Sequence, residues 1–289
     1  MRPRRYRVQH RTTYSYSDDV SSSYGRAYLT PREGPGQRLI EHEVLIDPVP
    51  SDRSVGADVY GNLTLYFHVT SEHRRLEVIG ESVVEVDPPA PHRDSMPWEQ
   101  ARPTPASGPL AMEFALDLLP PEITAEITTY AAETFSPGRP LSAAVAELNS
   151  RIHADFAYKS GSTTVTTGVA DVFAARQGVC QDFARIGAAC LRSQGLAARY
   201  VSGYMVTVPP PGKPRLVGAD ATHAWAAVWV PGGHWINFDP TNDQFADERY
   251  VTLAWGRDYA DVPPLRGIIY TDAKQSSITV AVDVAPIGD

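Results

Sequence analysis

Residues 176–191 have the sequence RQGVCQDFARIGAACL, which holds the strongest structural and chemical signal in the chain. Apolar residues recur in this stretch at spacings of three and four, and this pattern predicts a buried helix. Because Gly178 interrupts whatever precedes it, Cys180 should lie in the first turn of that helix. A thiol at this position faces free N–H groups and the positive end of the helix dipole, which favour the thiolate. The helix therefore offers either a nucleophile or simply a small apolar residue at Cys180.

The length and composition allow two domains and argue against nucleic-acid binding. The chain has 289 residues, which is long for one domain and comfortable for two. Its hydrophobic content of 43% and charged content of 21% are ordinary for a soluble globular protein. The net charge of −8 and the pI near 5.5 do not fit a nucleic-acid-binding surface.

The two cysteines and the N-terminal segment indicate in which cellular compartment the protein works. Cys180 and Cys190 lie on the same predicted helix, about 15 Å apart at a rise of ~1.5 Å per residue. A disulfide needs Cα atoms within about 7 Å of each other, so these two cysteines cannot form one. No apolar segment follows Met1, and no run approaches the ~18 apolar residues that a membrane span needs. We therefore expect a cytoplasmic protein with no membrane partner.

Residues 1–87 predict an N-terminal β-rich domain. Runs of β-forming residues alternate with clusters of Pro, Gly, Asp and Asn, which favours an antiparallel β-sandwich-like domain of short strands. The arginines near the N-terminus alternate with apolar residues, which indicates one exposed face of a strand. Four scattered histidines are expected to be strand-face or surface residues rather than ligands. They are His10, His42, His68 and His73.

The rest of the chain divides into a linker, a core and a C-terminal segment. Residues 88–107 are a proline-rich linker, and residues 108–262 form a core of helices packed on an antiparallel sheet, so the fold class is α+β. Residues 263–289 hold at least one strand, at 277–284, which we expect to return to the N-terminal sheet. A Pro/Gly loop is predicted at 209–214. The expected core helices are 110–119, 121–135, 141–156 and 169–176, and the expected strands are 198–206, 223–230 and 234–239.

Acyl transfer through Cys180 would need a base and a group that orients it, and His223 and Asp239 can supply them. Residues 231–233, Pro-Gly-Gly, predict a hairpin between the last two core strands. If Val230 pairs with residue 235, Asp239 falls on the face opposite to His223. If Val230 pairs with His234 across a three-residue loop, Asp239 lies diagonal to His223, about 7–8 Å away between Cα atoms. The catalytic interpretation therefore predicts an odd-length connection or a bulge.

Two other classes of function remain open from the residues alone. A metal-binding module could use Cys180, His223 and Asp239, because all three side chains are zinc donors. Structural zinc sites usually show paired ligands such as Cys-x-x-Cys, which this sequence lacks, so we expect no metal and no cofactor. A non-catalytic interaction protein is the other possibility, with the N-terminal domain making the contacts.

Four motifs of the core, in this order, strongly resemble the transglutaminase-like superfamily, with the bacterial branch the most similar. Segments of the N-terminal region resemble the β-rich domain that accompanies this core in bacteria: 14–16 (YSY), 31–32 (PR) and 58–62 (DVYGN). Residues 256–264 (GRDYADVPP) also resemble that branch, so the similarity extends over nearly the whole chain. The core motifs are 178–184 (GVCQDFA), 195–204 (GLAARYVSGY), 220–225 (DATHAW) and 238–242 (FDPTN).

The resemblance implies a papain-like core whose triad maps onto Cys180, His223 and Asp239. In this hypothesis Cys180 attacks the carbonyl of an amide in a peptide or protein substrate. His223 holds the thiolate as an ion pair and then protonates the departing amine, while Asp239 orients the imidazole. The implied product of the first half-reaction is a thioester. Water would make the protein a protease or amidase, whereas an amine acceptor would make it a cross-linking transglutaminase.

We expect hydrolysis, because the bacterial branch is protease-like and the sequence has no calcium loop of the Asp-x-Asp-x-Asn-Gly kind. Transamidation, as in a protein-glutamine gamma-glutamyltransferase, is the alternative. The natural substrate and the oligomeric state stay open.

Further site residues follow from position alone. The backbone N–H of Cys180 should stabilise the oxyanion, and Tyr158, upstream of the nucleophile, is a candidate for the second donor. Trp225 and Trp229 share the face of His223 on the same strand and are candidates for the substrate cleft. Arg185 departs from the family pattern, in which His is more often expected. This departure bears on the chemistry of the pocket rather than on the triad.

Overall fold

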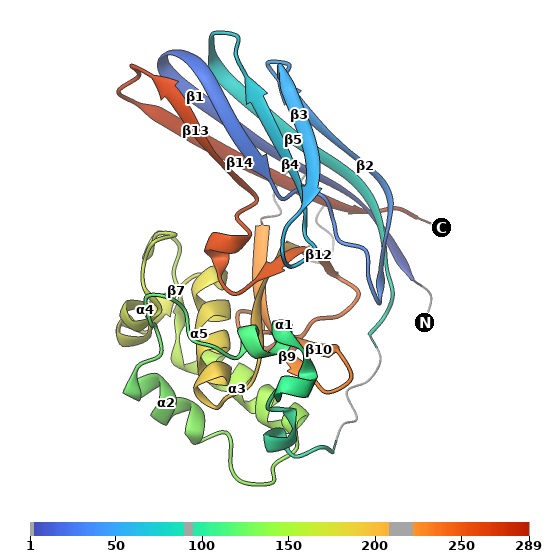
Figure 1. Ribbon diagram of the computed structural model, residues 1–289, viewed down its shortest axis with the longest axis vertical. Helices are drawn as coiled ribbons and strands as arrows, with labels where there is room; N and C mark the ends of the chain where they lie inside the picture. The colour runs from blue at the N-terminus through green and yellow to red at the C-terminus, as the bar shows by residue number, and fades with distance from the viewer. Residues whose placement is uncertain (1–2, 90–94, 208–221, 289) are drawn as a thin grey trace, which may run out of the picture.

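The computed structural model describes residues 3–89, 95–207 and 222–288 and has an α+β fold. Strands dominate one end of the molecule, and helices cover a second sheet at the other end (Figure 1). The predicted loop at 209–214 and residues 90–94 of the predicted linker lie outside the described ranges. No helix within the described ranges is long and apolar enough to cross a membrane.

The N-terminal domain is built around one long strand, β1 (Arg4–Ala27). Its first half pairs with β5 and β14, and its second half pairs with β4 and β13. Register shifts between Ser15 and Val20, and between Val20 and Ser22, allow β1 to bend. The expected antiparallel β-rich domain is thus one sheet curled on itself, and its strands are longer than the short ones expected: β1 has 24 residues. Its other strands are β2 (Gln37–Asp47), β3 (Asp52–Ala57), β4 (Leu63–Val69), β5 (His73–Val86), β13 (Leu265–Thr271) and β14 (Ser276–Pro286).

The last strand returns to the N-terminal sheet, as expected. β14 runs antiparallel to β1 from the Tyr6–Pro286 pair to the Tyr16–Ser276 pair. Buried and exposed residues alternate along the start of β1, and Arg5 on the exposed side pairs with Glu85 at 3.0 Å. Arg5, Arg7 and Arg11 therefore share one strand face, as interpreted, whereas Arg4 falls on the same face as Tyr6 and Val8.

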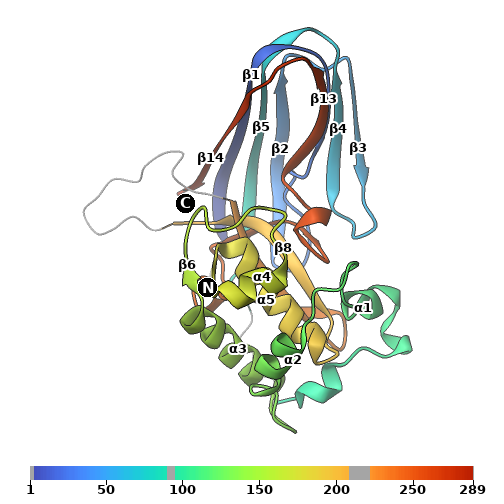
Figure 2. The ribbon, with the colours of Figure 1, turned by 90° about the vertical axis from the view of Figure 1, so that its left-hand side faces the viewer.

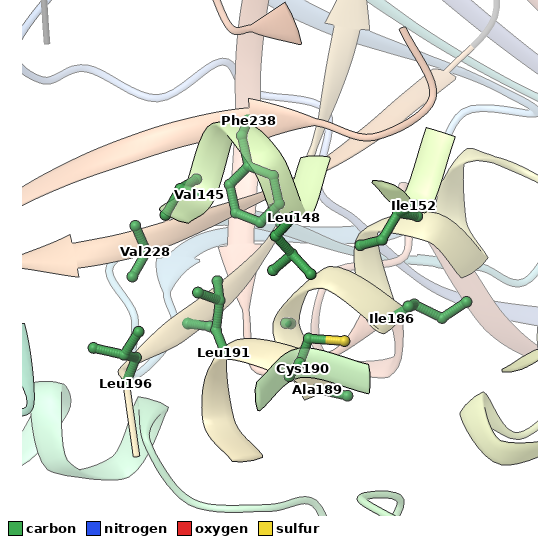
Figure 3. Packing of buried hydrophobic residues seen from close by; sticks show 14 of the residues in the cluster. Val145, Leu148, Ile152, Ile186, Ala189, Cys190, Leu191, Leu196, Val228 and Phe238 are labelled. Carbon is green, nitrogen blue, oxygen red and sulfur yellow. The ribbon is translucent and has the colours of Figure 1, made fainter. Parts of the chain in front are cut away.

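The core domain packs helices on a five-stranded antiparallel sheet of order β11-β10-β9-β8-β12. Figure 3 shows the apolar cluster between them, which contains Ile186 and Leu191 of α5 and Val228 and Phe238 of the sheet. The strands are β8 (Ala198–Met205), β9 (Thr222–Val230), β10 (His234–Asp239), β11 (Gln244–Phe245) and β12 (Tyr250–Gly256). The helices are η1 (Trp98–Ala101), η2 (Pro105–Ser107), α1 (Pro109–Phe114), α2 (Ala125–Ala132), α3 (Leu141–Asp155), α4 (Val169–Ala175), α5 (Cys180–Ser193) and η3 (Tyr259–Asp261), and a small parallel pair joins β6 (Ala157–Tyr158) to β7 (Gln177–Gly178).

One helix begins later than the sequence predicts. The helix expected at 121–135 starts at Ala125, because Thr124 caps it: the Thr124 hydroxyl accepts the N–H of Ile127 at 3.3 Å. The preceding residues are held by the Asp117 carboxylate, which accepts the N–H of Glu122 at 3.2 Å. Capping by Thr124 thus corrects the expected start.

The curled sheet stands on the core domain (Figure 2). The two domains share an apolar cluster and a covered sheet edge. β12 lies at the edge of the core sheet, where two amide side chains of the N-terminal domain replace a neighbouring strand. Gln37 bonds to both the N–H and the C=O of Thr252, at 2.8 Å each. Asn62 does the same for Trp255, at 2.8 and 2.9 Å. These paired amides satisfy backbone groups that an open edge would expose.

We predict that Gly203→Ala destabilises the core, because a Cβ at Gly203 would lie 2.2 Å from the carbonyl oxygen of Val251 and 2.6 Å from the Trp225 ring. Relieving such an overlap should cost about 1–3 kcal/mol, measured by urea unfolding. The matched control is Gly56→Ala on β3, where a Cβ has no neighbour within 4 Å. Equal stability changes in the two variants would contradict the prediction.

Candidate active site

Cys180 is the first residue of α5, as the sequence predicts. The turn before it is fixed by the buried carboxylate of Asp182, which accepts the N–H of Val179 at 2.9 Å and the hydroxyl of Thr163 at 2.6 Å. A Cβ at Gly178 would lie only 2.8 Å from Asp182, so glycine permits this close approach. As the first helical residue, Cys180 keeps an N–H that no intrahelical bond uses. Its side chain is partly exposed.

The hairpin that carries the other two residues has the odd-length connection that the catalytic interpretation requires. Val230 pairs with His234, and Ala226 pairs with Phe238. The three-residue loop turns through Gly232 and Gly233, which have φ of 94° and 85° and so favour glycine. Asp239 therefore falls opposite position 225, diagonal to His223 and on the same face. The predicted register is confirmed.

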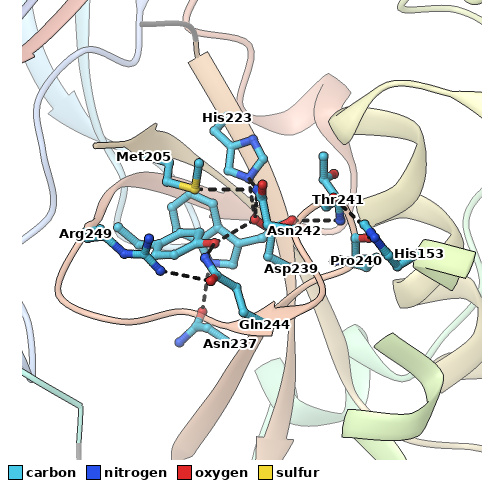
Figure 4. Close-up of polar contacts among 12 residues, drawn as sticks. His153, Met205, His223, Asn237, Asp239, Pro240, Thr241, Asn242, Gln244 and Arg249 are labelled. Atoms are coloured by element: carbon cyan, nitrogen blue, oxygen red, sulfur yellow. Dashed lines mark hydrogen bonds and ion pairs between the residues drawn. The ribbon is translucent and has the colours of Figure 1, made fainter. Parts of the chain in front are cut away.

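The imidazole of His223 is held by a fully buried carboxylate (Figure 4). His223 Nε2 lies 2.6 Å from Asp239 Oδ2, and Asp239 is 0% exposed. Three further donors reach the same carboxylate: the Tyr250 hydroxyl at 2.7 Å, the Asn242 amide at 2.7 Å and the Thr241 N–H at 2.9 Å. Four donors satisfy a carboxylate that would otherwise be costly to bury.

These contacts set the charge of the pair. Burial lowers the pKa of His223, but the hydrogen bonds and negative charges of Asp239 and Cys180 outweigh burial and raise it to about 10. Burial raises the pKa of Asp239, but the hydrogen bond and the charge of His223 outweigh it and bring that pKa below its ordinary value. The pair is therefore an imidazolium and a carboxylate at neutral pH. Because Nε2 faces Asp239, Nδ1 is the ring nitrogen left for the thiol.

Cys180 and His223 line one pocket, with a volume of about 350 Å³, at the junction of the two domains. Here called the Cys180 pocket, it receives residues from α5, β8 and β9 of the core and from β1 and β14 of the N-terminal domain. A partly exposed thiol and a charged imidazole in one pocket form an arrangement suited to nucleophilic chemistry on a carbonyl. Within the described residues, no group of three His, Cys, Asp or Glu side chains is arranged to hold a metal ion.

Comparisons with known proteins agree with this architecture. The family model of the bacterial transglutaminase-like N-terminal region matches residues 6–85, and that of the transglutaminase-like superfamily matches residues 128–240. The chain belongs to the transglutaminase-like superfamily. An uncharacterized protein of Mycobacterium tuberculosis is 57% identical over 291 residues, covering 98% of this chain and 93% of its own. One from Mycobacterium leprae is 33% identical over 290 residues, covering 97% and 98%.

A solved structure has the same fold as this member of the superfamily. The protein comes from Cytophaga hutchinsonii and is described as a candidate cysteine protease. It aligns with a TM-score of 0.78 at 19% identity, over 100% of this chain and 92% of its own. The likeness therefore covers both the curled sheet and the superfamily core.

The structure brings Tyr158 to the Cys180 pocket. Tyr158 pairs with Gly178 between the short parallel strands β6 and β7, which places it beside the turn that leads into Cys180. Partial burial, followed by the electrostatic effect of Cys180, raises the pKa of Tyr158. Its hydroxyl therefore stays protonated at neutral pH and is able to donate a hydrogen bond.

The two tryptophans are placed differently from the sequence expectation. Trp225 packs against the rings of His223 and Tyr250, with centroids at 6.1 and 5.2 Å, and it lines a neighbouring cavity with Tyr250 rather than the Cys180 pocket. Trp229 lies with Phe114 in a buried apolar cluster, away from that pocket. The correction has a simple cause: six residues along a strand cover about 20 Å, so a shared face does not bring Trp229 near His223.

Arg185 makes structural contacts within the core. Its guanidinium is buried and pairs with Glu122 at 2.8 Å and with Asp258 at 2.7 Å. It also donates to the carbonyl of Thr167 at 2.6 Å. Arg185 is not among the described residues that line the Cys180 pocket, so its ion pairs join segments of the core.

The sequence analysis did not predict the residues, other than His223, that donate hydrogen bonds to Asp239 or support those donors. The Tyr250 hydroxyl, which donates to Asp239, accepts from the Gln244 amide at 2.5 Å, and Gln244 in turn accepts from Arg249 at 2.9 Å. Burial, followed by the charge of Asp239, raises the pKa of Tyr250 well above its ordinary value. Tyr250 looks like an ordinary strand residue in the sequence, so no local signal indicates this role. Asn242 lies in the motif 238–242, and this motif is the only feature of the sequence that points to it.

We predict that two histidines lining the Cys180 pocket titrate at opposite ends of the pH range. His223 should stay charged up to about pH 10, whereas burial lowers the pKa of His10 to about 4. Imidazole ¹H–¹⁵N NMR spectra recorded against pH measure both. In Asp239→Asn the hydrogen bond and the charge of Asp239 are lost and only Cys180 opposes the effect of burial, so the pKa of His223 should fall well below about 10. His10 should not change.

The same shift predicts a pH-dependent stability. Because the folded pKa of His223 exceeds the unfolded value of about 6.5, its pairing stabilises the fold fully below about pH 6.5. That contribution is lost as the pH rises through about 10. In Asp239→Asn this dependence should be weaker, and the contribution should be lost at a lower pH. Titration of wild-type His223 near pH 6.5 would contradict both expectations.

Proposed function

We propose that this protein is a cysteine-dependent hydrolase of amide bonds that acts through a thioester intermediate. The observation that carries the proposal is the contact of 2.6 Å between His223 and the buried Asp239, in a hairpin that brings His223 to the same pocket as Cys180. A nucleophile, a base and an orienting group in this order support a catalytic triad.

The first half-reaction forms the thioester. The Cys180 thiolate attacks the amide carbonyl carbon, and the new S–C bond places negative charge on the carbonyl oxygen. The N–H of Cys180 at the start of α5 is the proposed first donor to this oxyanion, and the Tyr158 hydroxyl is the proposed second donor. His223 then gives its proton to the departing nitrogen as the C–N bond breaks. Asp239 keeps the imidazole oriented throughout.

The second half-reaction releases the acid. Neutral His223 takes a proton from water as the water oxygen attacks the thioester carbonyl, and the C–S bond then breaks. The thiolate and imidazolium are thereby restored. Hydrolysis, rather than transfer to an amine, is in line with the description of the Cytophaga hutchinsonii protein as a candidate cysteine protease. Transfer of the acyl group to an amine would need the same triad.

We predict that Cys180→Ala abolishes turnover on denatured casein supplied with dansylcadaverine as an amine. Mass spectrometry follows three products: new chain termini, glutamate formed from glutamine, and glutamine carrying the amine. Wild-type protein should yield hydrolysis products, and Cys180→Ala should reduce their rate about 10³-fold or more, because the nucleophile is lost.

Cys190→Ala is the matched control, since Cys190 lies on the same helix but is fully buried. It should retain turnover. Predominant incorporation of dansylcadaverine would overturn hydrolysis in favour of transamidation. Hydrolysis that persists in Cys180→Ala would overturn the assignment of the nucleophile.

A further inference from the structure

The N-terminal domain contributes one side of the Cys180 pocket. In the β1–β14 pair, Thr12 lies opposite Val280, and Tyr14 lies opposite Ile278. Alternate residues of a strand share a face, and cross-strand partners project to the same side. All four of these residues line the Cys180 pocket. This pocket face, formed by β1 and β14, is therefore a continuous strip of the curled sheet that lies against the nucleophile.

The opening of the pocket is apolar. On the pocket face, Val280 is 48% exposed and Ile278 is 58% exposed. On the core side, Tyr158 is 57% exposed and Val165 is 58% exposed, and both line the same pocket. Single exposed apolar residues are common on protein surfaces, but four from three separate segments around one opening indicate a binding function.

The deep part of the pocket face is polar but uncharged. His10 and Thr12 are buried, and the ring nitrogens of His10 lie 3.0 Å from the Tyr204 hydroxyl and 3.1 Å from the Thr12 hydroxyl. Burial lowers the pKa of His10 to about 4, so this histidine is neutral at neutral pH. Both ring nitrogens have partners, which leaves His10 no unmet need for an ionic ligand.

The charges of the residues that line the Cys180 pocket indicate which substrate side chains it can accept. The described residues that line the Cys180 pocket include no Asp, Glu, Lys or Arg. The charges of Cys180 and His223 on this lining are paired with each other in the proposed mechanism, so a charged side chain that entered would lose water without gaining an unpaired opposite charge, which is costly. An apolar or aromatic side chain would instead cover the exposed surfaces of Val280, Ile278 and Tyr158 and gain from their burial.

We propose that the Cys180 pocket selects substrates with an uncharged apolar or aromatic side chain beside the reacting carbonyl, and that β1 and β14 form its specificity surface. The proposal rests on the hydrolase function proposed above. A volume of about 350 Å³ suits one large side chain together with the amide that reacts. The curled N-terminal sheet would thus be part of the enzyme's recognition surface.

The test uses the full chain and a series of peptidyl chloromethyl ketones that differ only in the side chain beside the ketone. Second-order rate constants for labelling of Cys180 are measured with Phe, Leu, Glu and Lys at this position. Each rate constant is divided by the rate constant of the same protein with iodoacetamide. Iodoacetamide carries no amino-acid side chain, so its rate reports the reactivity of the thiol alone. The Phe and Leu ratios should exceed the Glu and Lys ratios at least about tenfold.

Substitution on β14 should change this preference. Val280→Glu places a negative charge on the pocket face, so the Phe ratio should fall about tenfold and the Lys ratio should rise. Val55→Glu on β3 is the matched control, because Val55 is an exposed strand residue that does not line the pocket. It should keep the wild-type ratios. Ile278→Glu provides a second variant if Val280→Glu does not fold.

Each outcome separates this proposal from the proposed function. Equal ratios for apolar and charged probes, or unchanged ratios in both β14 variants, would overturn the specificity proposal while leaving a reactive Cys180 intact. A Cys180 that reacts slowly with iodoacetamide as well as with every ketone would overturn the hydrolase function, and the specificity proposal with it.

Discussion

The buried carboxylate of Asp239 is the constraint on which the site depends. An ionised group with no exposure to water is stable only when donors surround it, and Asp239 has four, from β9, β12 and the turn after β10. Supplying these donors fixes the register of the hairpin and the place of Tyr250 at the start of β12. The same interactions hold His223 charged and leave one ring nitrogen for the thiol.

Contacts between the two domains place the N-terminal sheet beside the Cys180 pocket. Gln37 and Asn62 close the edge of the core sheet, and an apolar cluster joins Tyr6 and Val8 of β1 to the core. The last strand pairs with the first, so β14 and β1 lie together against the Cys180 pocket. A domain held this firmly beside Cys180 is suited to the role in substrate selection that we propose for it.

The parts of the site that depend on local pattern could be predicted from the sequence. Helical spacing and Gly178 placed Cys180 at the start of α5, and loop length limited the hairpin to two registers, of which only one allows a triad. Contacts between distant segments leave no local pattern in the sequence and could not be predicted. His10 bonds to Tyr204, which lies 194 positions away, and Tyr250 bonds to Asp239 from another strand. Trp229 shows what periodicity leaves open: it predicts that Trp229 and His223 share a strand face, but not how far apart they lie.

The most direct test of the account is the reactivity of the two cysteines toward brief iodoacetamide treatment near pH 6, followed by mass spectrometry. An ordinary thiol, with a pKa of about 8.5, barely reacts there, and burial raises the pKa of Cys190 to about 12. The account predicts rapid labelling at Cys180 alone, lost in His223→Ala. Slow labelling of Cys180, or rapid labelling that survives His223→Ala, would contradict it.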